Sequence, residues 1–275
     1  MRHSNTPRRW WWWLVGMLTL CGCAPQSSTA QPIVTPTLSA ARTATPQVTS
    51  TPIMTPSGNA PGWTSVSSAN WSGYTLPPVG VTGVRAQWTE PQLSGTPDTS
   101  SAIWVGIGGW DATFNDVVQV GVRPYLRVDG TQSHRIWYET LPPNSWHLTD
   151  LTVAPGDAIT ASVTLVPSST NQWQLALHDT TSGVSFAQTV THTSARSYAD
   201  IIVEDPNATT NNGPPYYAFT HFSPITFTSA QVNYGGGWVA FGHIAALQVR
   251  MVQNNATVAQ PGPLVNDTFT VQRGS

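Results

Sequence analysis

The feature that most constrains this chain is a repeated alternation of apolar and polar residues in short runs. A period of two places the apolar members of each run on one face of a β-strand. Turn residues separate the runs, and Asp129-Gly130 is the strongest such signal because the tight hairpin turn needs positive φ. The clearest runs are Val84, Ala86 and Trp88; Val118, Val120 and Val122; Ile159, Ala161, Val163 and Leu165; Trp173, Leu175 and Leu177; and Ile201 and Val203.

Composition agrees with this pattern. The 23 Pro and 22 Gly, with no long segment rich in Ala, Glu and Leu, argue against helices and for short strands joined by turns. We therefore predict an all-β fold, an antiparallel β-sandwich of the jelly-roll or concanavalin-like kind. Strong twist in such large sheets should curl one of them into a concave face that can hold an extended substrate.

Residues 1–22 have the pattern of an export signal. Three Arg precede an apolar run at 10–20, which is too short to be a stable membrane anchor. The run ends in Leu20-Cys21-Gly22-Cys23, which resembles a bacterial lipobox with Cys23 as the lipid-carrying mature N-terminus. An ordinary signal peptide is the alternative. We therefore expect an exported lipoprotein, anchored at the cell surface or on the extracytoplasmic side of a membrane.

Residues 23–62 are rich in Ser, Thr and Pro, with Arg42 as the only charged residue. A segment of this composition cannot bury a core. We interpret it as a disordered tether, and a propeptide is the competing interpretation. The folded domain then occupies residues 63–275.

Several chemistries are excluded by what the chain lacks. There is no Lys, and no Cys follows Cys23, which excludes Schiff-base, P-loop and cysteine-nucleophile chemistry and a disulfide framework in the mature domain. The seven His show no metal-binding spacing, so we expect neither a metal nor a cofactor. Without the signal, the chain has eight Arg and 13 acidic residues and is therefore net negative, so nucleic acid is not an expected partner. We expect a monomer that meets a membrane only through its lipid.

Five motifs occur in a fixed order, and together they are specific. They are Asn70-Trp71-Ser72-Gly73-Tyr74, Ile103-Trp104-Val105-Gly106-Ile107-Gly108-Gly109, Val118-Gln119-Val120-Gly121-Val122, Trp137-Tyr138-Glu139 and Ile201-Ile202-Val203-Glu204-Asp205-Pro206. In this order the chain resembles the glutamic peptidases, or eqolisins, from Asn70 to about Val232. The resemblance implies a catalytic pair of Gln119 and Glu204. It also implies a substrate groove beside the pair, lined by Trp104 and Trp137 and including Glu139.

Periodicity supports the pair independently, because Gln119 and Glu204 each alternate with apolar residues and so project away from the apolar face. Peptide hydrolysis needs a base that takes a proton from water and a donor to the oxyanion. Glu204 can be that base, and with an ordinary pKa of about 4.3 it stays partly ionised in acid. The Gln119 amide can donate at any pH. We therefore expect an acid endopeptidase that cleaves proteins or peptides without an acyl-enzyme.

The chain departs from the family pattern at four positions around the groove. Gly108, Arg123 and Arg135 stand where the family usually has acidic residues, and Leu141 stands where an aromatic residue is frequent. We count Arg123 and Arg135 among the substrate-binding residues. Arg123 lies on the face of Gln119 and could favour acidic substrate side chains. The alternative is an arginine at the rim paired with a local Asp.

Two other functions remain open on the sequence alone. A concanavalin-like sandwich could be a glycan-binding module that uses exposed Trp such as Trp146 as stacking platforms. A glycoside hydrolase on this fold would normally show two carboxylates spaced along one strand, a pattern that the three Glu do not give. A serine triad has no local signature here, since the chain lacks a GxSxG elbow.

Overall fold

The computed structural model describes residues 63–77, 80–110, 116–142, 146–206 and 218–274. The predicted signal, Cys23 and the predicted tether lie outside these residues. Within them, the one helical element is a single 3-10 turn, η2 (Phe241–His243), and no helix is long and apolar enough to cross a membrane. The all-β prediction is confirmed.

The strands form two layers. The first layer contains eight strands in hydrogen-bonded order. They are β1 (Trp63–Ser68), β18 (Ala246–Gln253), β2 (Trp71–Leu76), β13 (Ala199–Glu204), β6 (Ala102–Gly108), β7 (Val117–Leu126), β8 (Gln132–Leu141) and β9 (His147–Val153). The turn at Asp129-Gly130 joins β7 to β8, with Gly130 at φ +80° as the sequence predicted.

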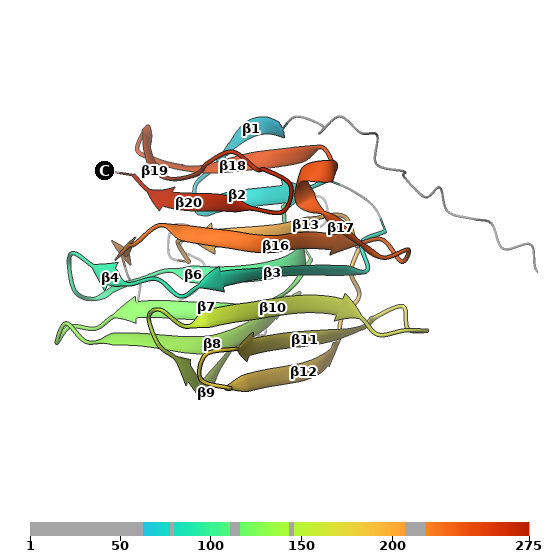
Figure 1. Ribbon diagram of the computed structural model, residues 1–275, viewed down its shortest axis with the longest axis horizontal. Coiled ribbons are helices and arrows are strands. Elements are labelled where there is room, and N and C mark those ends of the chain that lie inside the picture. The colour runs from blue at the N-terminus through green and yellow to red at the C-terminus, as the bar shows by residue number, and fades with distance from the viewer. Residues whose placement is uncertain (1–62, 78–79, 111–115, 143–145, 207–217, 275) are drawn as a thin grey trace, which may run out of the picture. The chain divides into compact units, whose positions relative to one another are not determined.

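The second layer packs against the first, and Figure 1 shows its strands β16, β3 and β10 in front of β13, β6 and β7. Its order is β12 (Ser185–Thr191), β11 (Gln172–Asp179), β10 (Ala158–Leu165), β3 (Gly83–Thr89), β16 (Ile225–Asn233), β20 (Phe269–Arg273) and β19 (Ala256–Pro261). Because β19 also pairs with β18, the two layers are continuous along one edge.

Short strands complete the sandwich. They are β4 (Leu93–Ser94) with β15 (His221–Phe222), β5 (Thr99–Ser100) with β14 (Ala218–Phe219), and β17 (Trp238–Ala240) beside β16. The sheets are predominantly antiparallel, as predicted, and the pairs β1–β18 and β5–β14 are parallel. Alternation defines which face of a strand is apolar but carries no information on strand direction.

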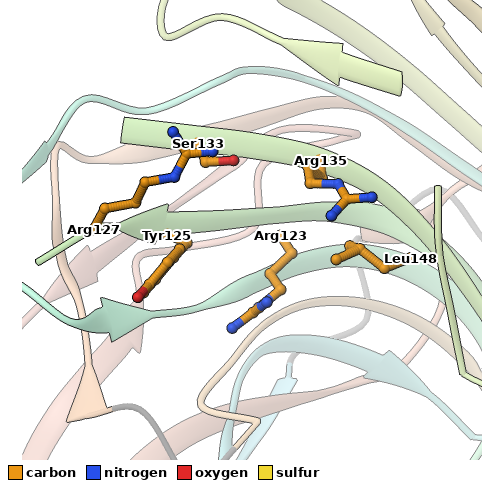
Figure 2. A pocket seen from close by; sticks show the side chains of 6 residues that line it. All are labelled: Arg123, Tyr125, Arg127, Ser133, Arg135 and Leu148. Atoms are coloured by element: carbon orange, nitrogen blue, oxygen red, sulfur yellow. The ribbon is translucent and has the colours of Figure 1, made fainter. Parts of the chain in front are cut away.

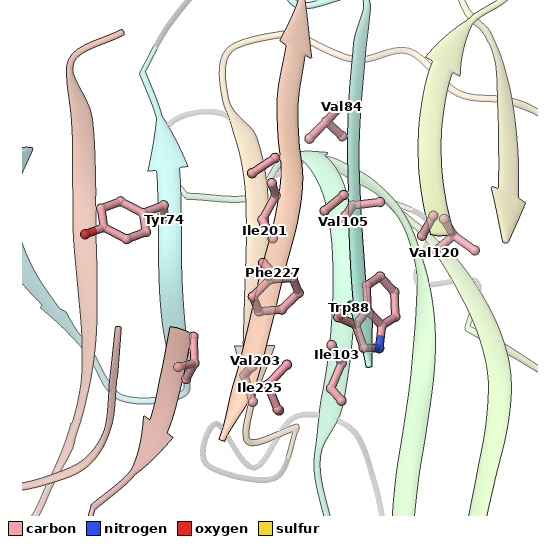
Figure 3. Close-up of a cluster of buried hydrophobic side chains, with 14 of the residues drawn as sticks. Tyr74, Val84, Trp88, Ile103, Val105, Val120, Ile201, Val203, Ile225 and Phe227 are labelled. Atoms are coloured by element: carbon pink, nitrogen blue, oxygen red, sulfur yellow. The ribbon is translucent and has the colours of Figure 1, made fainter. Parts of the chain in front are cut away.

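The main core lies between the layers and is built from the predicted alternating runs (Figure 3). Val105, Val120 and Ile201 of the first layer meet Trp88 and Phe227 of the second, and all five are almost completely buried. Burying one such side chain stabilises the fold by about 1.5–3 kcal/mol. The core therefore fixes which face of β13, β6 and β7 points inward.

The other face of the first layer is also partly apolar. A second, smaller cluster there contains Ala102, Trp104, Trp137 and Ile202, with Trp71 and Leu148 packed against it. Every residue of β6 is buried, so this strand has no fully solvated face. We call this side of β13, β6, β7 and β8 the outer face, and it carries the candidate site.

Candidate active site

Strand register sets the outer face in three neighbouring rows. The first row is Asp200, Gly106, Gln119 and Glu139, and the second is Ile202, Trp104, Gly121 and Trp137. The third row contains two pairs: Glu204 pairs with Ala102, and Arg123 pairs with Arg135. The two pairs lie at one level because Ile103 and Val122 are paired, and Ala102 and Arg123 are the next residues in the same direction along the two antiparallel strands. All the site residues predicted from the sequence within the domain therefore lie on one face of four adjacent strands.

Trp104 occupies the middle of this face because two glycines leave room for it. A Cβ at Gly106 would lie 2.8 Å from Cζ3 of Trp104. A Cβ at Gly121 would lie 2.1 Å from the backbone oxygen of Ile103 and 2.6 Å from Cβ of Trp104. Real Cβ atoms do not approach backbone this closely, so Gly121 of the Gln119 motif is a packing requirement of the site.

Side chains from neighbouring strands hold the Glu204 carboxyl group. Trp104 Nε1 donates to Oε2 at 2.8 Å, and Asn70 Nδ2 donates to Oε1 at 3.2 Å. Trp71 packs edge-on against Trp104, with ring centroids 4.9 Å apart. The carboxyl group thus has a fixed orientation toward the outer face.

The pKa of Glu204 differs from the sequence expectation. Burial is the main cause that raises this pKa to about 7, and the negative charge of Glu139 raises it further. Hydrogen bonds from Trp104, Trp71 and Asn70 lower the pKa and offset part of this rise. The ordinary pKa near 4.3 assumed from the sequence is therefore wrong for this site. That value holds for a carboxylate in water, whereas the fold buries the carboxyl group of Glu204.

Gln119 lies in the first row and is only 5% exposed. Its Nε2 donates to Oε2 of Glu139, its cross-strand partner, at 2.8 Å. Burial raises the pKa of Glu139, and the hydrogen bond from Gln119 works against that rise. Glu139 therefore fixes the position of the Gln119 amide.

Two buried polar atoms near the pair have no protein partner. Oε1 of Gln119 and Nε1 of Trp137 make no hydrogen bond to any described residue. A buried acceptor and a buried donor left open in this way call for a ligand such as water or a peptide group. This region of the outer face can thus bind polar atoms of a substrate.

Asp200 is a site residue that sequence reasoning missed. It is fully buried in the first row, and burial raises its pKa well above the ordinary value. Thr75 on β2 is its cross-strand neighbour and partly opposes the rise, although no hydrogen bond of normal geometry joins them. The sequence did contain a signal for Asp200, which precedes Glu204 by four residues. Residues four apart in a strand lie on the same face, so this spacing places Asp200 on the face of Glu204. Its burial depends on β2 and β6, which are distant in sequence.

The arginines predicted near the groove line a cavity of about 180 Å³ with Tyr125, Arg127, Ser133 and Leu148 (Figure 2). Arg123 Nε donates to Ser100 Oγ at 3.0 Å. Arg135 Nε donates to the Thr149 carbonyl oxygen at 2.7 Å, and its Nη2 lies 2.9 Å from Oδ1 of Asp150, which is fully exposed. The interpretation of a rim arginine paired with a local Asp thus describes Arg135.

Other expectations from the sequence have simpler outcomes. Leu141 is the last residue of β8 and pairs with Val117. Trp146, the possible glycan platform, is 46% exposed. Among the described residues, no three His, Cys, Asp or Glu side chains are grouped so that they could hold a metal ion.

Comparisons with known proteins identify the family and the fold. The model of the peptidase A4 family matches residues 69–273. The chain is 28% identical to aspergillopepsin-2 from Aspergillus niger over 232 residues, which are 74% of this chain and 77% of that protein. It is 29% identical to scytalidopepsin B from Scytalidium lignicola over 197 residues, 69% of this chain and 72% of that protein. A crystal structure of scytalido-glutamic peptidase with a peptide-based transition-state analogue is similar at a TM-score of 0.63 and 25% identity, covering 75% of this chain and 98% of that one.

The buried carboxyl groups predict how stability depends on pH. Folding raises the pKa of Glu139, Asp200 and Glu204, so their stabilising contribution is complete below about pH 4 and is lost as pH rises through the raised values. His192, whose pKa burial lowers, acts in the opposite direction. We predict that the melting temperature falls between pH 5 and pH 8, and that Asp200→Asn, which stays neutral, flattens the fall.

Differential scanning calorimetry across this range measures the effect, with about 2–4 °C expected per kcal/mol for a domain of this size. Asp150→Asn is the matched control because that carboxylate is fully exposed. A wild-type melting temperature that rises over this range, or an Asp200→Asn slope equal to that of wild type, contradicts the prediction.

Proposed function

The chain belongs to the peptidase A4 family of glutamic endopeptidases, and from that premise we propose that Glu204 and Gln119 together activate a water molecule for peptide-bond hydrolysis. One observation carries the proposal. The Glu204 carboxyl group, held by Trp104 and Asn70, lies on the same sheet face as the Gln119 amide, whose Oε1 has no partner among the described residues. Proteins or peptides are the substrates.

The first step is attack by water on the scissile carbonyl carbon. The Glu204 carboxylate takes a proton from the water, and the new C–O bond leaves a negative charge on the former carbonyl oxygen. Gln119 Oε1 accepts a hydrogen bond from the other O–H of the water, which keeps its proton, and so orients the nucleophile. The Nε2 hydrogen of Gln119 that is not used by Glu139 donates to the oxyanion.

The second step breaks the C–N bond. The protonated Glu204 passes its proton to the leaving nitrogen, which departs as an amine, while the carbon becomes that of a carboxylic acid. Glu204 is a carboxylate again at the end of this step. No covalent bond to the protein forms, which fits a chain whose mature domain has no cysteine.

Neighbouring side chains position the reacting groups. Glu139 fixes the Gln119 amide through its hydrogen bond, and Trp104 fixes the Glu204 carboxylate. The open Nε1 of Trp137 can donate to a backbone carbonyl of the substrate, in agreement with its predicted place in the groove. These residues make the arrangement rigid before substrate binds, which lowers the reorganisation that the reaction needs.

We also propose that the domain is exported and held at a membrane through lipid on Cys23. The support is in the sequence: a short apolar run ends at Leu20-Cys21-Gly22-Cys23, and residues 23–62 are rich in Ser, Thr and Pro with one charged residue, the composition expected of a tether. This arrangement would present the outer face of the sheet to substrates outside the cell.

Substitution of the pair tests the catalytic proposal. Glu204→Gln removes the base and should abolish turnover, while Gln119→Ala should lower kcat about 100-fold to 1,000-fold, roughly 3–4 kcal/mol. Gln188→Ala is the control, since Gln188 is an exposed residue of β12 in the second layer. The measurement is hydrolysis of a quenched fluorescent peptide, with circular dichroism to check folding. Folded Glu204→Gln with full activity refutes the mechanism.

The pH profile tests the ionisation state of Glu204. A pKa raised to about 7 means that the fraction of ionised Glu204 grows roughly tenfold per unit as pH rises through the acidic range. We predict that kcat/KM for an uncharged peptide rises with pH through the acidic range on a limb governed by this group, and that the rise levels off only near neutral pH. Glu139→Gln removes a like charge and should move the limb to lower pH. A wild-type limb with an apparent pKa of 4 or less contradicts the assignment.

Cys23 gives a test of location. Cys23→Ser should release the protein from membranes in a fractionation experiment, because the lipid would have no attachment site. If wild type and variant are both soluble, the anchor proposal is wrong.

A further inference from the structure

We propose that the cavity lined by Arg123, Arg127 and Arg135 is a subsite for the carboxylate of an acidic substrate side chain, and that the enzyme therefore prefers Glu or Asp at one position near the cleaved bond. The inference rests on the proposed function, because it names the substrate class that the same outer face selects.

The cavity lies within reach of a bound peptide. Arg123 follows Gln119 by four residues on β7, a distance of about 13 Å at roughly 3.3 Å per residue. Arg123 also lies at the level of Glu204, two strands away across the sheet, or roughly 10 Å. An extended substrate that passes the pair therefore reaches the cavity within about three or four residues.

The pairing of the two strands favours an anion between them. Arg123 and Arg135 are directly opposite each other on β7 and β8, and like charges in that position destabilise a sheet. The contacts at Nε hold the two side chains to different neighbours, Arg123 to Ser100 and Arg135 to Thr149. Figure 2 shows the side chains arranged around a common space on strongly curved strands. A carboxylate in that space relieves the repulsion.

The lining fits an acidic side chain in size and chemistry. A volume of about 180 Å³ equals roughly six water molecules at about 30 Å³ each, which is room for a carboxylate and its alkyl stem. Leu148 can contact the stem, and Ser133 and Tyr125 add hydroxyl groups. Guanidinium groups bind carboxylates with two parallel hydrogen bonds, which gives direction as well as charge.

The acidic groups of the protein near the cavity stand outside its lining. Asp150 pairs with Arg135, Asp98 accepts a hydrogen bond from Tyr125, and Asp129 interacts with the charge of Arg127. All three carboxylates are exposed, where water and salt screen them. None of the six lining residues is acidic, so the cavity has a positive charge throughout the acidic range.

Matched peptides test the preference. The substrates are N-acetylated, C-amidated fluorogenic peptides that are identical except for Glu or Gln at one position, scanned over four positions on each side of the cleaved bond. At one position we expect kcat/KM for the Glu peptide to exceed that for the Gln peptide about tenfold at pH 5.5. The ratio should fall below about 2 at pH 3, because the substrate carboxyl group, with a pKa of about 4.3, becomes neutral. A ratio near 1 at every position at pH 5.5 overturns the proposal.

Variants assign the preference to the cavity. Arg123→Gln and Arg135→Gln should each lower the Glu/Gln ratio of kcat/KM severalfold. Arg123→Glu should reverse the charge preference, so that a peptide with Lys at the same position is cleaved with a higher kcat/KM than the Glu peptide. Arg85→Gln removes the same charge from β3, where Arg85 bonds Gln231, and should leave the ratio unchanged. A ratio that falls equally in Arg85→Gln and Arg123→Gln shows a general charge effect and overturns the subsite.

Two further outcomes separate the possible failures. If the wild-type enzyme shows no preference for Glu peptides but cleaves Gln peptides in a Glu204-dependent way, the subsite alone is refuted. If the wild-type enzyme cleaves no peptide, the proposed function is refuted. A peptide with a free C-terminus supplies the other source of a carboxylate. If only that peptide is favoured over its amidated form, the cavity binds chain ends and the side-chain proposal is wrong.

Discussion

The register of β13, β6, β7 and β8 is the constraint on which the rest of the structure depends. Residues on a strand alternate between faces, so a slip of one residue in β7 would bury Gln119 in the main core and expose Val118 and Val120. The apolar face prevents that slip because it packs against the second layer. The positions of Gln119, Trp104 and Glu204 on the outer face are thus a consequence of core packing, and the site needs no separate element to hold it.

Burial on both faces determines the chemistry of that site. Trp104 and Trp137 form an apolar cluster on the outer face, and a carboxyl group buried beside such a cluster is more stable without charge. Asp200 has the same property, although no reacting group depends on it in the proposed mechanism. Carboxyl groups that are neutral in acid cost the fold least in acid, so the same desolvation that alters Glu204 also favours folding at low pH.

The sequence was informative wherever the relevant interactions are local. Alternation predicted the strands, their inward faces and the hairpin turns, and the family motifs placed Gln119 and Glu204 on one side of the sheet. It could not predict contacts that depend on pairing between distant strands. Asn70 meets Glu204 only because β2 lies beside β13, across more than a hundred residues of chain. The burial of Asp200 and the raised pKa of Glu204 arise from the same long-range pairing, and propensity and spacing do not encode desolvation.

The ionisation of carboxyl groups at the outer face makes stability, the proposed catalysis and the proposed substrate preference all depend on pH. In the proposed mechanism, Glu204 gains the charge that a base needs as pH rises from strongly acidic values. Over the same range an acidic substrate gains the charge that the proposed arginine subsite would bind. The stabilising effect of the buried, neutral carboxyl groups declines over the same range. Activity and substrate selection thus increase with pH while stability decreases. We therefore expect the proposed enzyme to work where the substrate carboxylate is ionised and Glu204 is partly ionised, while Asp200 still holds its proton.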